Sequence, residues 1–322
     1  MKFIRFINKF IRSILYLILN KDNKKIKILA NNLLLSKFHL LDIGAAGDIN
    51  NRWTQIKQNI ILSLVEPHKE SASDLKKKGH TIIEKIFYNK KNLNLTFYKT
   101  DKPTCSGILK PNLKHVTKYP LPDRFKILDK VELVTTTIDE EFKLNDVPHF
   151  IKMDTQGSEL EILKGSINSL KNVLGLEIEC EFFHLYENQP LFYEIKDFLE
   201  DHDFEFIDFL RTVRWERHKH RYTGQPQISD VLFLKKPNLI LEKFKSNEIK
   251  EEILFKYFVI LIIYNRADLI KFLNDNLNSD IINKFELRSI HNFVEKKVSN
   301  INRIRKYSSA LEDLVNNLLS SK

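Results

Sequence analysis

Cysteine, glycine and proline are scarce in this 322-residue chain, and each scarcity excludes a class of protein. Cys105 and Cys180 are the only cysteines, and their spacing fits neither a disulfide framework nor a metal-binding motif. Eight glycines and nine prolines are too few for a collagen-like or low-complexity chain. No apolar run approaches the ~20 residues that a transmembrane helix needs. The sequence therefore indicates a globular protein suited to a reducing cytoplasm.

Positive charge is present in excess. The chain has 52 Lys and Arg residues against 42 Asp and Glu residues, which gives a net charge of +10 and a pI of about 9.3. This excess permits an anionic partner: a nucleic acid, a membrane surface or a phosphorylated substrate. Lys, Asn and Ile are used heavily throughout, however, and a genome-wide bias has the same effect. No arginine-rich tail or RNA-binding signature is present, so nucleic acid is the weakest of the three options.

The N-terminal residues 1–20, MKFIRFINKFIRSILYLILN, have the pattern of a basic amphipathic helix. Charges continue to Arg12, which argues against a membrane span, and no small-residue cleavage site marks a signal peptide. Two interpretations stay open. The helix lies on an anionic membrane, which would make the protein membrane-peripheral, or it packs on the rest of the chain or on a second subunit.

A strand–turn–strand pattern follows at residues 38–67. The apolar run Phe38–Ile43 leads into the small-residue turn Gly44-Ala45-Ala46-Gly47, and a helix-compatible segment leads to a second apolar run, Ile60–Val65. Glu66 and Pro67 come directly after this second run. Strand, glycine turn, helix, strand and acidic residue form the opening of a nucleotide-binding βαβ unit. Glycines at such a turn let the backbone approach a ligand closely.

Two details of this stretch favour S-adenosylmethionine (SAM) over a dinucleotide. The turn has the spacing GxxG instead of GxGxxG, and Asp42 precedes it on the first strand. A pyrophosphate is repelled by a neighbouring carboxylate, whereas SAM has no phosphate and carries an ammonium and a sulfonium. Glu66 is placed to accept hydrogen bonds from the ribose hydroxyls of either cofactor. The alternative is an ordinary βαβ turn without a ligand. The predicted cofactor-binding residues here are Asp42, Gly44, Ala45, Gly47, Glu66 and Pro67.

A second stretch, FIKMDTQGSELEILKG at residues 150–165, reads as a buried strand that ends in Asp154, then Gly157, then a helix. Six segments occur in a fixed order: LLDIGAAGD, VEP, VTTTIDE, FIKMDTQGSELEILKG, LEIECEF and ISDVLFLKK. Together they resemble the FkbM family of SAM-dependent methyltransferases over about residues 38–236. The family methylates hydroxyl groups, often on sugars of glycans or glycosylated metabolites.

The resemblance implies a fold class and a domain organisation. The expected fold is an α/β class I methyltransferase, a Rossmann-like doubly wound sheet whose last strand is antiparallel. It also implies that Phe87, near the end of the third strand, stacks on adenine, although core packing explains Phe87 equally well. The predicted domains are residues 1–27, an amphipathic helix and linker; residues 28–237, the methyltransferase domain; and residues 238–322. This last region lies outside the resemblance and reads as a helical appendage for acceptor choice or oligomerisation.

Methyl transfer to a hydroxyl calls for a general base, because a hydroxyl is a weak nucleophile. Asp154, at the carboxyl end of the fourth strand, is the first candidate, since ligands collect there in open α/β sheets. It could instead bind the substrate or a divalent ion. His184 is the second candidate, with an exposed or core histidine as the alternative. Glu159 more simply favours its helix dipole. Glu179 and Glu181 alternate with Cys180 but have no further ligand spacing, so no metal is predicted.

Three residues are predicted to contact the acceptor. Ser106 matches part of a serine-rich patch that the resemblance places near the active site, with a plain turn serine as the alternative. Arg214 and Arg217 belong to a basic stretch, Arg211 to Arg221, that we expect in the loop of the last hairpin. Arginine forks bind phosphate or carboxylate well, so the sugar acceptor is expected to be anionic; a solvated loop is the alternative.

Other functions stay open at this point. The chain could be a non-catalytic scaffold with a SAM-binding fold, or a methyltransferase for another small molecule or a protein. Base N-methylation is disfavoured, because the place of a proline-rich tetrapeptide such as NPPY reads DTQG, residues 154–157. The expected location is the cytoplasm, free or at the membrane surface, and a homo-oligomer is one use of the C-terminal helices.

Overall fold

The structure, a computed structural model, describes residues 24–45, 50–67, 69–77, 82–143, 146–217, 224–300 and 302. The predicted helix at residues 1–20 lies outside these ranges. The chain divides into two units: residues 1–36, 50–59 and 240–322 form the first, and residues 37–49 and 60–239 form the second. The boundary predicted after residue 27 falls inside a helix at residues 24–33, because this helix continues past the predicted charged linker.

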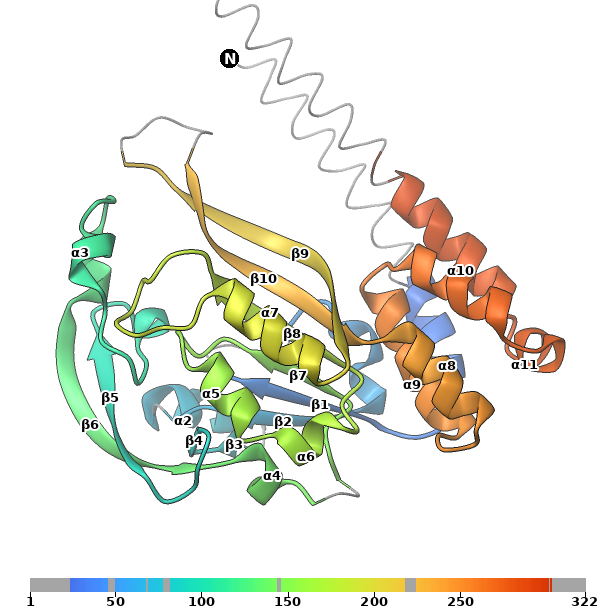
Figure 1. Cartoon of the computed structure of the whole chain (residues 1–322), viewed down its shortest axis with the longest axis horizontal. Helices are drawn as coiled ribbons and strands as arrows, with labels where there is room; N and C mark the ends of the chain where they lie inside the picture. The colour runs from blue at the N-terminus through green and yellow to red at the C-terminus, as the bar shows by residue number, and fades with distance from the viewer. Residues whose placement is uncertain are drawn as a thin grey trace, which may run out of the picture. The chain divides into compact units, whose positions relative to one another are not determined.

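A seven-stranded sheet forms the centre of the second unit (Figure 1). Its order is β3-β2-β1-β7-β8-β10-β9. The first five strands in this order are parallel, and β10 is antiparallel to both β8 and β9. The antiparallel last pair confirms the expected class I methyltransferase fold. The strands are β1 Phe38–Ile43, β2 Ile60–Val65, β3 Ile82–Ile83, β7 Phe150–Met153, β8 Gly175–Glu181, β9 Phe204–Trp215 and β10 Gln225–Lys235.

The main core lies between one face of this sheet and a layer of helices (Figure 1). Alternate residues of the central strands point into it, such as Leu41 and Ile43 of β1 and Ile151 and Met153 of β7. The helices that cover this face are α4 Ile138–Glu141, α5 Glu159–Lys164, α6 Ile167–Leu170 and α7 Phe192–Asp201. Burial of this apolar face fixes the register, so the carboxyl ends of β1, β2, β7 and β8 meet at one edge.

The third strand, which was expected to end near Phe87, is split in the structure. Ile82–Ile83 forms β3 of the large sheet, whereas Ile86–Phe87 forms β4 of a separate three-stranded sheet with the order β4-β6-β5. The prediction failed because these isoleucines pair with different partners: β3 runs beside β2, and β4 runs beside β6. The other strands of the small sheet are β5 Asn94–Thr100 and β6 Ile127–Thr136, with the short helices η2 Pro103–Cys105, α3 Leu113–Val116 and η3 Pro122–Phe125 between them.

The helix predicted after Gly157 is also divided. It breaks between α5 and α6 at Gly165, where an added Cβ would lie 2.1 Å from the carbonyl oxygen of Tyr88. The turn therefore packs directly on the backbone that follows β4. Asp139 caps the start of α6, because its carboxylate accepts hydrogen bonds from the backbone N–H groups of Asn168 and Ser169 at 3.0 and 2.7 Å.

The first crossover differs from the expected βαβ unit. The segment before β2 is a short 3-10 helix, η1 Thr54–Asn59, which belongs to the first unit. It does not continue as an α-helix because Ile56 leaves helical geometry, with φ −115° and ψ 16°. The next crossover, between β2 and β3, contains the α-helix α2 Lys69–Lys77.

The described part of the C-terminal region, up to residue 300, is mostly helical, as predicted. Its helices are α8 Pro237–Lys245, α9 Glu251–Ile263, α10 Ala267–Asn276, α11 Ser279–Lys284 and a further helix at residues 287–300. Every residue of α9 from Leu254 to Ile263 is buried. Burial on all sides of the helix explains why the sequence is apolar without a break from Tyr257 to Tyr264. In the part of the chain that the structure describes, no helix has both the length and the apolarity to cross a bilayer.

Candidate active site

A cavity opens at the carboxyl edge of the large sheet, where β1, β2 and β7 end. The cavity and its open mouth together enclose about 810 Å³ of space that no atoms fill. Six predicted site residues line it: Gly44, Glu66, Pro67, Phe87, Ser106 and Asp154. The structure thus brings together residues that are up to 110 positions apart in the sequence.

Gly44 forms the floor of the turn after β1. Its φ of +84° lies in the left-handed region, and an added Cβ would lie 1.9 Å from the carbonyl oxygen of Asp154. The Asp154 N–H donates to the carbonyl of Ile43 at 3.0 Å, so the two strand ends are locked together. Gly44 therefore lets the turn after β1 pack directly against the backbone of Asp154, which follows β7. The same turn can also let the backbone approach a ligand closely.

Glu66 and Phe87 form the wall on the β2 side. Glu66 is buried at the end of β2, where its N–H donates to the carbonyl of Ile83 at 3.2 Å. Phe87 belongs to the main core and also lines the cavity, and its stacking on adenine stays a prediction. Its side chain is 1% exposed. This wall offers one carboxylate within an apolar surface.

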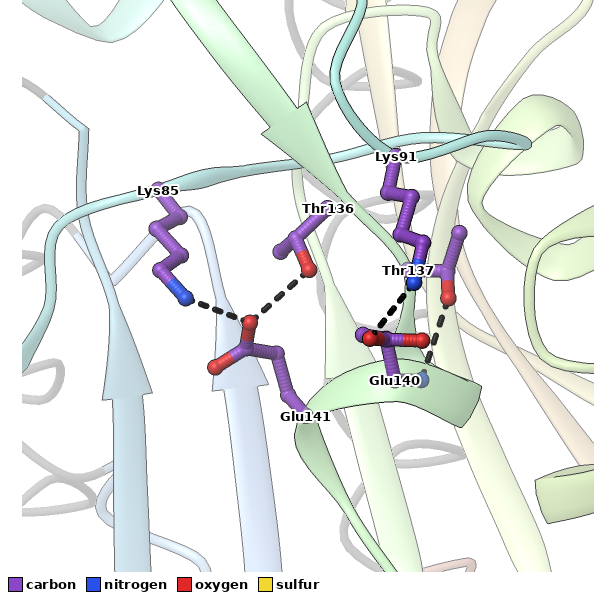
Figure 2. A network of polar contacts seen from close by, with 6 residues as sticks. All are labelled: Lys85, Lys91, Thr136, Thr137, Glu140 and Glu141. Atoms are coloured by element: carbon purple, nitrogen blue, oxygen red, sulfur yellow. Dashed lines mark hydrogen bonds and ion pairs between the residues drawn. The ribbon is translucent and has the colours of Figure 1, made fainter.

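A polar network holds the chain around β4 against the start of α4 (Figure 2). Lys85 donates to Glu141 at 2.6 Å, Thr136 donates to the same carboxylate at 2.8 Å, and Lys91 pairs with Glu140 at 2.8 Å. Burial alone would raise the pKa of Glu141, but the hydrogen bonds from Lys85 and Thr136 outweigh it and lower the pKa. Lys85 itself lines the cavity, so this network helps to fix the wall that contains Phe87.

Two predicted cofactor residues lie elsewhere, and the position of a third is not described. Asp42 and Ala45 are buried but do not line the cavity, and Gly47 lies outside the described residues. The Asp42 carboxylate is 3.5 Å from the ammonium of Lys152 on β7. Burial raises the pKa of Asp42 to about 6, against the attraction of Lys152. The structure thus gives Asp42 an intramolecular partner, and its contact with a cofactor stays a prediction.

Asp154 follows β7 and lies on the cavity wall, as predicted from its position after the fourth strand. Its Oδ1 accepts a hydrogen bond from the Gln156 amide at 2.8 Å. The same amide nitrogen donates to Glu179 at 2.8 Å, and Gln156 Oε1 accepts from the Tyr186 hydroxyl at 2.6 Å. Gln156 and Tyr186 were missed by sequence analysis; Gln156 was visible within the DTQG motif, but Tyr186 gave no signal.

Buried carboxylates gather behind Asp154. Glu159, the first residue of α5, accepts hydrogen bonds from the backbone N–H and the hydroxyl of Thr155 at 2.7 and 2.9 Å. Burial raises the pKa of Glu159 to about 7 and raises the pKa values of Glu179 and Glu181 well above their usual range. Among the residues that the structure describes, no group of three or more His, Cys, Asp or Glu is arranged to hold a metal.

Of the remaining candidates, Ser106 lines the cavity and His184 does not. Ser106 lines it, and its hydroxyl oxygen accepts from the backbone N–H of Thr100 at 3.0 Å. His184 is exposed, does not line the cavity, and has its ring Nδ1 2.9 Å from the carbonyl oxygen of Gln189. Its predicted catalytic role therefore has no geometric support in this conformation.

Arg211 and Arg214 were expected in the hairpin loop, but both lie within strand β9, which continues to Trp215. The strand is longer than predicted because β9 pairs with β10 up to Trp215 and Gln225. Arg214 donates to the carbonyl of Gly224 at 3.0 Å. Arg214 and Arg217 are exposed and do not line the cavity, so their contact with an acceptor stays a prediction.

Comparison with known proteins gives a family. A profile described as the methyltransferase FkbM domain matches residues 46–206, which is half of the chain. A search of the curated proteins found no match. Similar solved structures include the magnesium protoporphyrin IX methyltransferase of Synechocystis PCC 6803 with bound SAM, at 10% identity, covering 67% of this chain and 79% of that one with a TM-score of 0.33.

Another is the precorrin-6y C5,15-methyltransferase of Geobacter metallireducens GS-15, at 13% identity, covering 66% of this chain and 87% of that one, again with a TM-score of 0.33. The strand order and directions described above define the fold. The cavity chemistry fits SAM, because a carboxylate at the end of β2 and apolar walls suit a cationic nucleoside. The chain therefore belongs to the FkbM methyltransferase family and is a SAM-dependent methyltransferase.

Proposed function

We propose that this protein is an O-methyltransferase that acts on a hydroxyl group of a sugar, in a glycan, a nucleotide sugar or a glycosylated metabolite. The observation that carries the proposal is the position of Asp154. Asp154 lines the cavity that Glu66 and Gly44 also line, so the proposed base and the predicted cofactor residues share one space.

The chemistry requires one proton acceptor. Bound SAM supplies a methyl group on a positively charged sulfur, which is already activated for displacement. Asp154 takes the proton of the acceptor hydroxyl as its oxygen bonds to the methyl carbon and the carbon–sulfur bond breaks, leaving a neutral thioether. The oxygen must be held about 3 Å from the methyl carbon with the sulfur opposite, so orientation contributes much of the rate.

The other lining residues bind and orient. Glu66 accepts hydrogen bonds from the ribose hydroxyls, and Phe87 and Pro67 cover apolar parts of the cofactor and exclude water. Ser106 directly follows η2 and lines the cavity. Its hydroxyl can contact the acceptor there. The acceptor side of the cavity thus carries hydroxyl and amide groups, which suit a sugar.

Mass spectrometry of cell-surface glycans and nucleotide sugars, from cells with and without the protein, tests the proposal. Loss of one O-methyl group, ~14 mass units per site, in cells lacking the protein is the expected result and identifies the acceptor. A methyl group that disappears instead from a protein or from a non-sugar metabolite would contradict the sugar assignment, while leaving SAM dependence intact.

A further inference from the structure

Gln156 makes three side-chain hydrogen bonds at the base of the cavity. Its amide nitrogen donates to Asp154 Oδ1 and to Glu179 Oε1, both at 2.8 Å, and its Oε1 accepts from the Tyr186 hydroxyl at 2.6 Å. The residue lines the cavity, so these bonds lie directly beside the proposed base. All three partners come from different segments: the end of β7, strand β8 and the loop after β8.

Tyr186 fixes which way the amide points. Its side chain is fully buried, and burial raises the pKa of the phenol well above its usual range, so the hydroxyl stays a donor. Its single hydrogen has two acceptors in reach, Gln156 Oε1 at 2.6 Å and the Cys105 carbonyl at 3.1 Å, and the shorter contact is to Gln156. The amide oxygen therefore faces Tyr186, and both N–H groups are left for the two carboxylates.

The amide separates two groups that repel each other. Burial raises the pKa of Glu179 well above its usual range, repulsion from Asp154 adds to this, and the Gln156 hydrogen bond opposes it. The charged groups that face the pair are Asp42 on β1, Lys152 on β7, Glu159 on α5, Glu181 on β8 and Asp230 on β10. A neutral donor between the two carboxylates stabilises their charged forms without introducing a further charge.

The backbone of Gln156 is strained. Its φ is +59°, and Gly157 follows with a φ of +103°. A left-handed non-glycine residue costs about 1 kcal/mol or more, and such residues gather at functional sites. This conformation directs the side chain back toward Asp154, two residues earlier, where the amide reaches the carboxylate.

The geometry points to Gln156 as a positioning residue: its amide, oriented by Tyr186, holds the Asp154 carboxylate by Oδ1 and leaves Oδ2 for the acceptor hydroxyl. Within the described residues, Oδ2 has no hydrogen-bond partner. The inference rests on the proposed role of Asp154 as the base. It assigns a task to two residues, Gln156 and Tyr186, that do not themselves take the proton.

The test is a carbon-detected NMR titration of the full-length protein labelled at the Asp and Glu carboxyl carbons. Gln156→Met keeps the volume but removes both N–H donors. The carboxyl carbon of Glu179 should then titrate about one pH unit higher than in the unsubstituted protein, since a hydrogen bond to its charged form is lost. Tyr186→Phe frees the amide to rotate and should shift the Glu179 titration in the same direction by less.

Gln225→Met is the matched control. Gln225 also accepts from a tyrosine hydroxyl, that of Tyr119 at 2.8 Å, but it lies on β10 and does not line the cavity. The Gln225→Met variant should leave the titration of Glu179 unchanged. Equal titrations in Gln156→Met and the unsubstituted protein would overturn the inference, even if the variant is less stable. The titration needs no acceptor, so it succeeds or fails independently of methyl transfer.

A second measurement separates positioning from cofactor binding. Gln156→Met should bind SAM in calorimetry as the unsubstituted protein does and transfer methyl groups about tenfold more slowly. A matching loss of SAM affinity would instead make Gln156 a cofactor ligand and overturn the positioning role. If Asp154→Asn keeps full turnover while the titration shift is observed, the base assignment fails and the hydrogen-bond arrangement stands.

Discussion

The two halves of the cavity wall differ in their charged groups. The half formed by β4 and by the ends of β1 and β2 presents Glu66 among apolar side chains, with Lys85 and Glu141 neutralising each other at its border. The half built from β7 and β8 places Asp154, Glu179 and other carboxylates close enough to repel one another. One half is suited to binding a cation, and the other is suited to holding and moving a proton.

The difference shows how one cavity serves two tasks. A cofactor site needs a carboxylate that stays ionised, whereas a base site benefits from neighbours that make ionisation harder. Gly44 joins the two halves, because it allows the turn after β1 to contact the backbone of Asp154. Substitutions in one half should therefore change SAM binding, and substitutions in the other should change methyl transfer. A substitution at Gly44 should affect both properties.

Gly44→Ala should have the largest effect. The added Cβ would collide with the Asp154 carbonyl, and the φ of +84° is unfavourable for alanine. We expect a loss of about 3 kcal/mol in the free energy of unfolding, measured by urea denaturation, together with loss of SAM binding. Gly107→Ala is the control, because its nearest atoms are 3.3 Å away. Equal stability of the two variants would contradict the account of Gly44.

Glu66→Gln tests the half that is proposed to bind the cofactor. SAM affinity should fall about tenfold to a hundredfold in calorimetry, because charge-assisted hydrogen bonds to the ribose contribute about 1.5–3 kcal/mol. Glu84→Gln is the control, since Glu84 is an acid near β4 that does not line this cavity. An unchanged SAM affinity in Glu66→Gln would break the assignment of this half to the cofactor.

Glu159→Gln tests the acidic half through its stability. Folding raises the pKa of Glu159 from 4.5 to about 7, so the folded protein keeps a proton that the unfolded chain releases between these values. The contribution of Glu159 to the free energy of unfolding is fully present below pH 4.5 and is lost as the pH rises through 7. Glutamine stays neutral, so the variant should gain about 1–2 kcal/mol over the unsubstituted protein at pH 8.5.

The same comparison at pH 4.5 should show little difference between the two proteins, and urea denaturation at both pH values measures it. Glu132→Gln serves as the control, because Glu132 is an exposed residue of β6 with a single hydrogen bond to Thr96 in the described structure. If Glu159→Gln destabilises the protein equally at both pH values, the hydrogen bonds to the Glu159 carboxylate outweigh its burial in their effect on the free energy of unfolding.

The smallest expected effect is that of the double variant Arg214→Glu, Arg217→Glu. If the acceptor is anionic, binding of a nucleotide sugar should weaken several-fold at low salt while SAM binding is unchanged. The difference should shrink as salt is added, because exposed charges are screened within about 10 Å at 0.1 M. Lys171→Glu, an exposed charge change near α6, is the control. Binding that responds to neither salt nor the substitution would leave both arginines as solvated residues.

Much of the fold could be predicted because its signals are local. The apolar runs at Phe38–Ile43 and Ile60–Val65 became strands with the predicted bounds, and the strand that begins at Phe150 ends at Met153, directly before Asp154. Six ordered motifs gave the family, and Gly44, Glu66 and Asp154 follow from the rule that ligands bind at the carboxyl ends of parallel strands. These residues share the cavity because sheet order brings β1, β2 and β7 together.

The rest depends on contacts that no local pattern encodes. The split between β3 and β4 results from pairing with two different strands, β2 and β6. The left-handed backbone of Gln156 and the reach of Tyr186 depend on side chains from distant segments. His184 was a reasonable candidate from its place after β8, but only the structure shows it outside the cavity.

The most direct test of the central claim compares SAM binding and methyl transfer in Asp154→Asn. With Asp154 as the base, calorimetry should give an unchanged SAM affinity, while transfer to the acceptor identified by mass spectrometry should fall by about a hundredfold or more. Unchanged transfer would contradict the claim and return His184 to consideration. A collapse of SAM affinity would also contradict it, by making Asp154 a cofactor ligand.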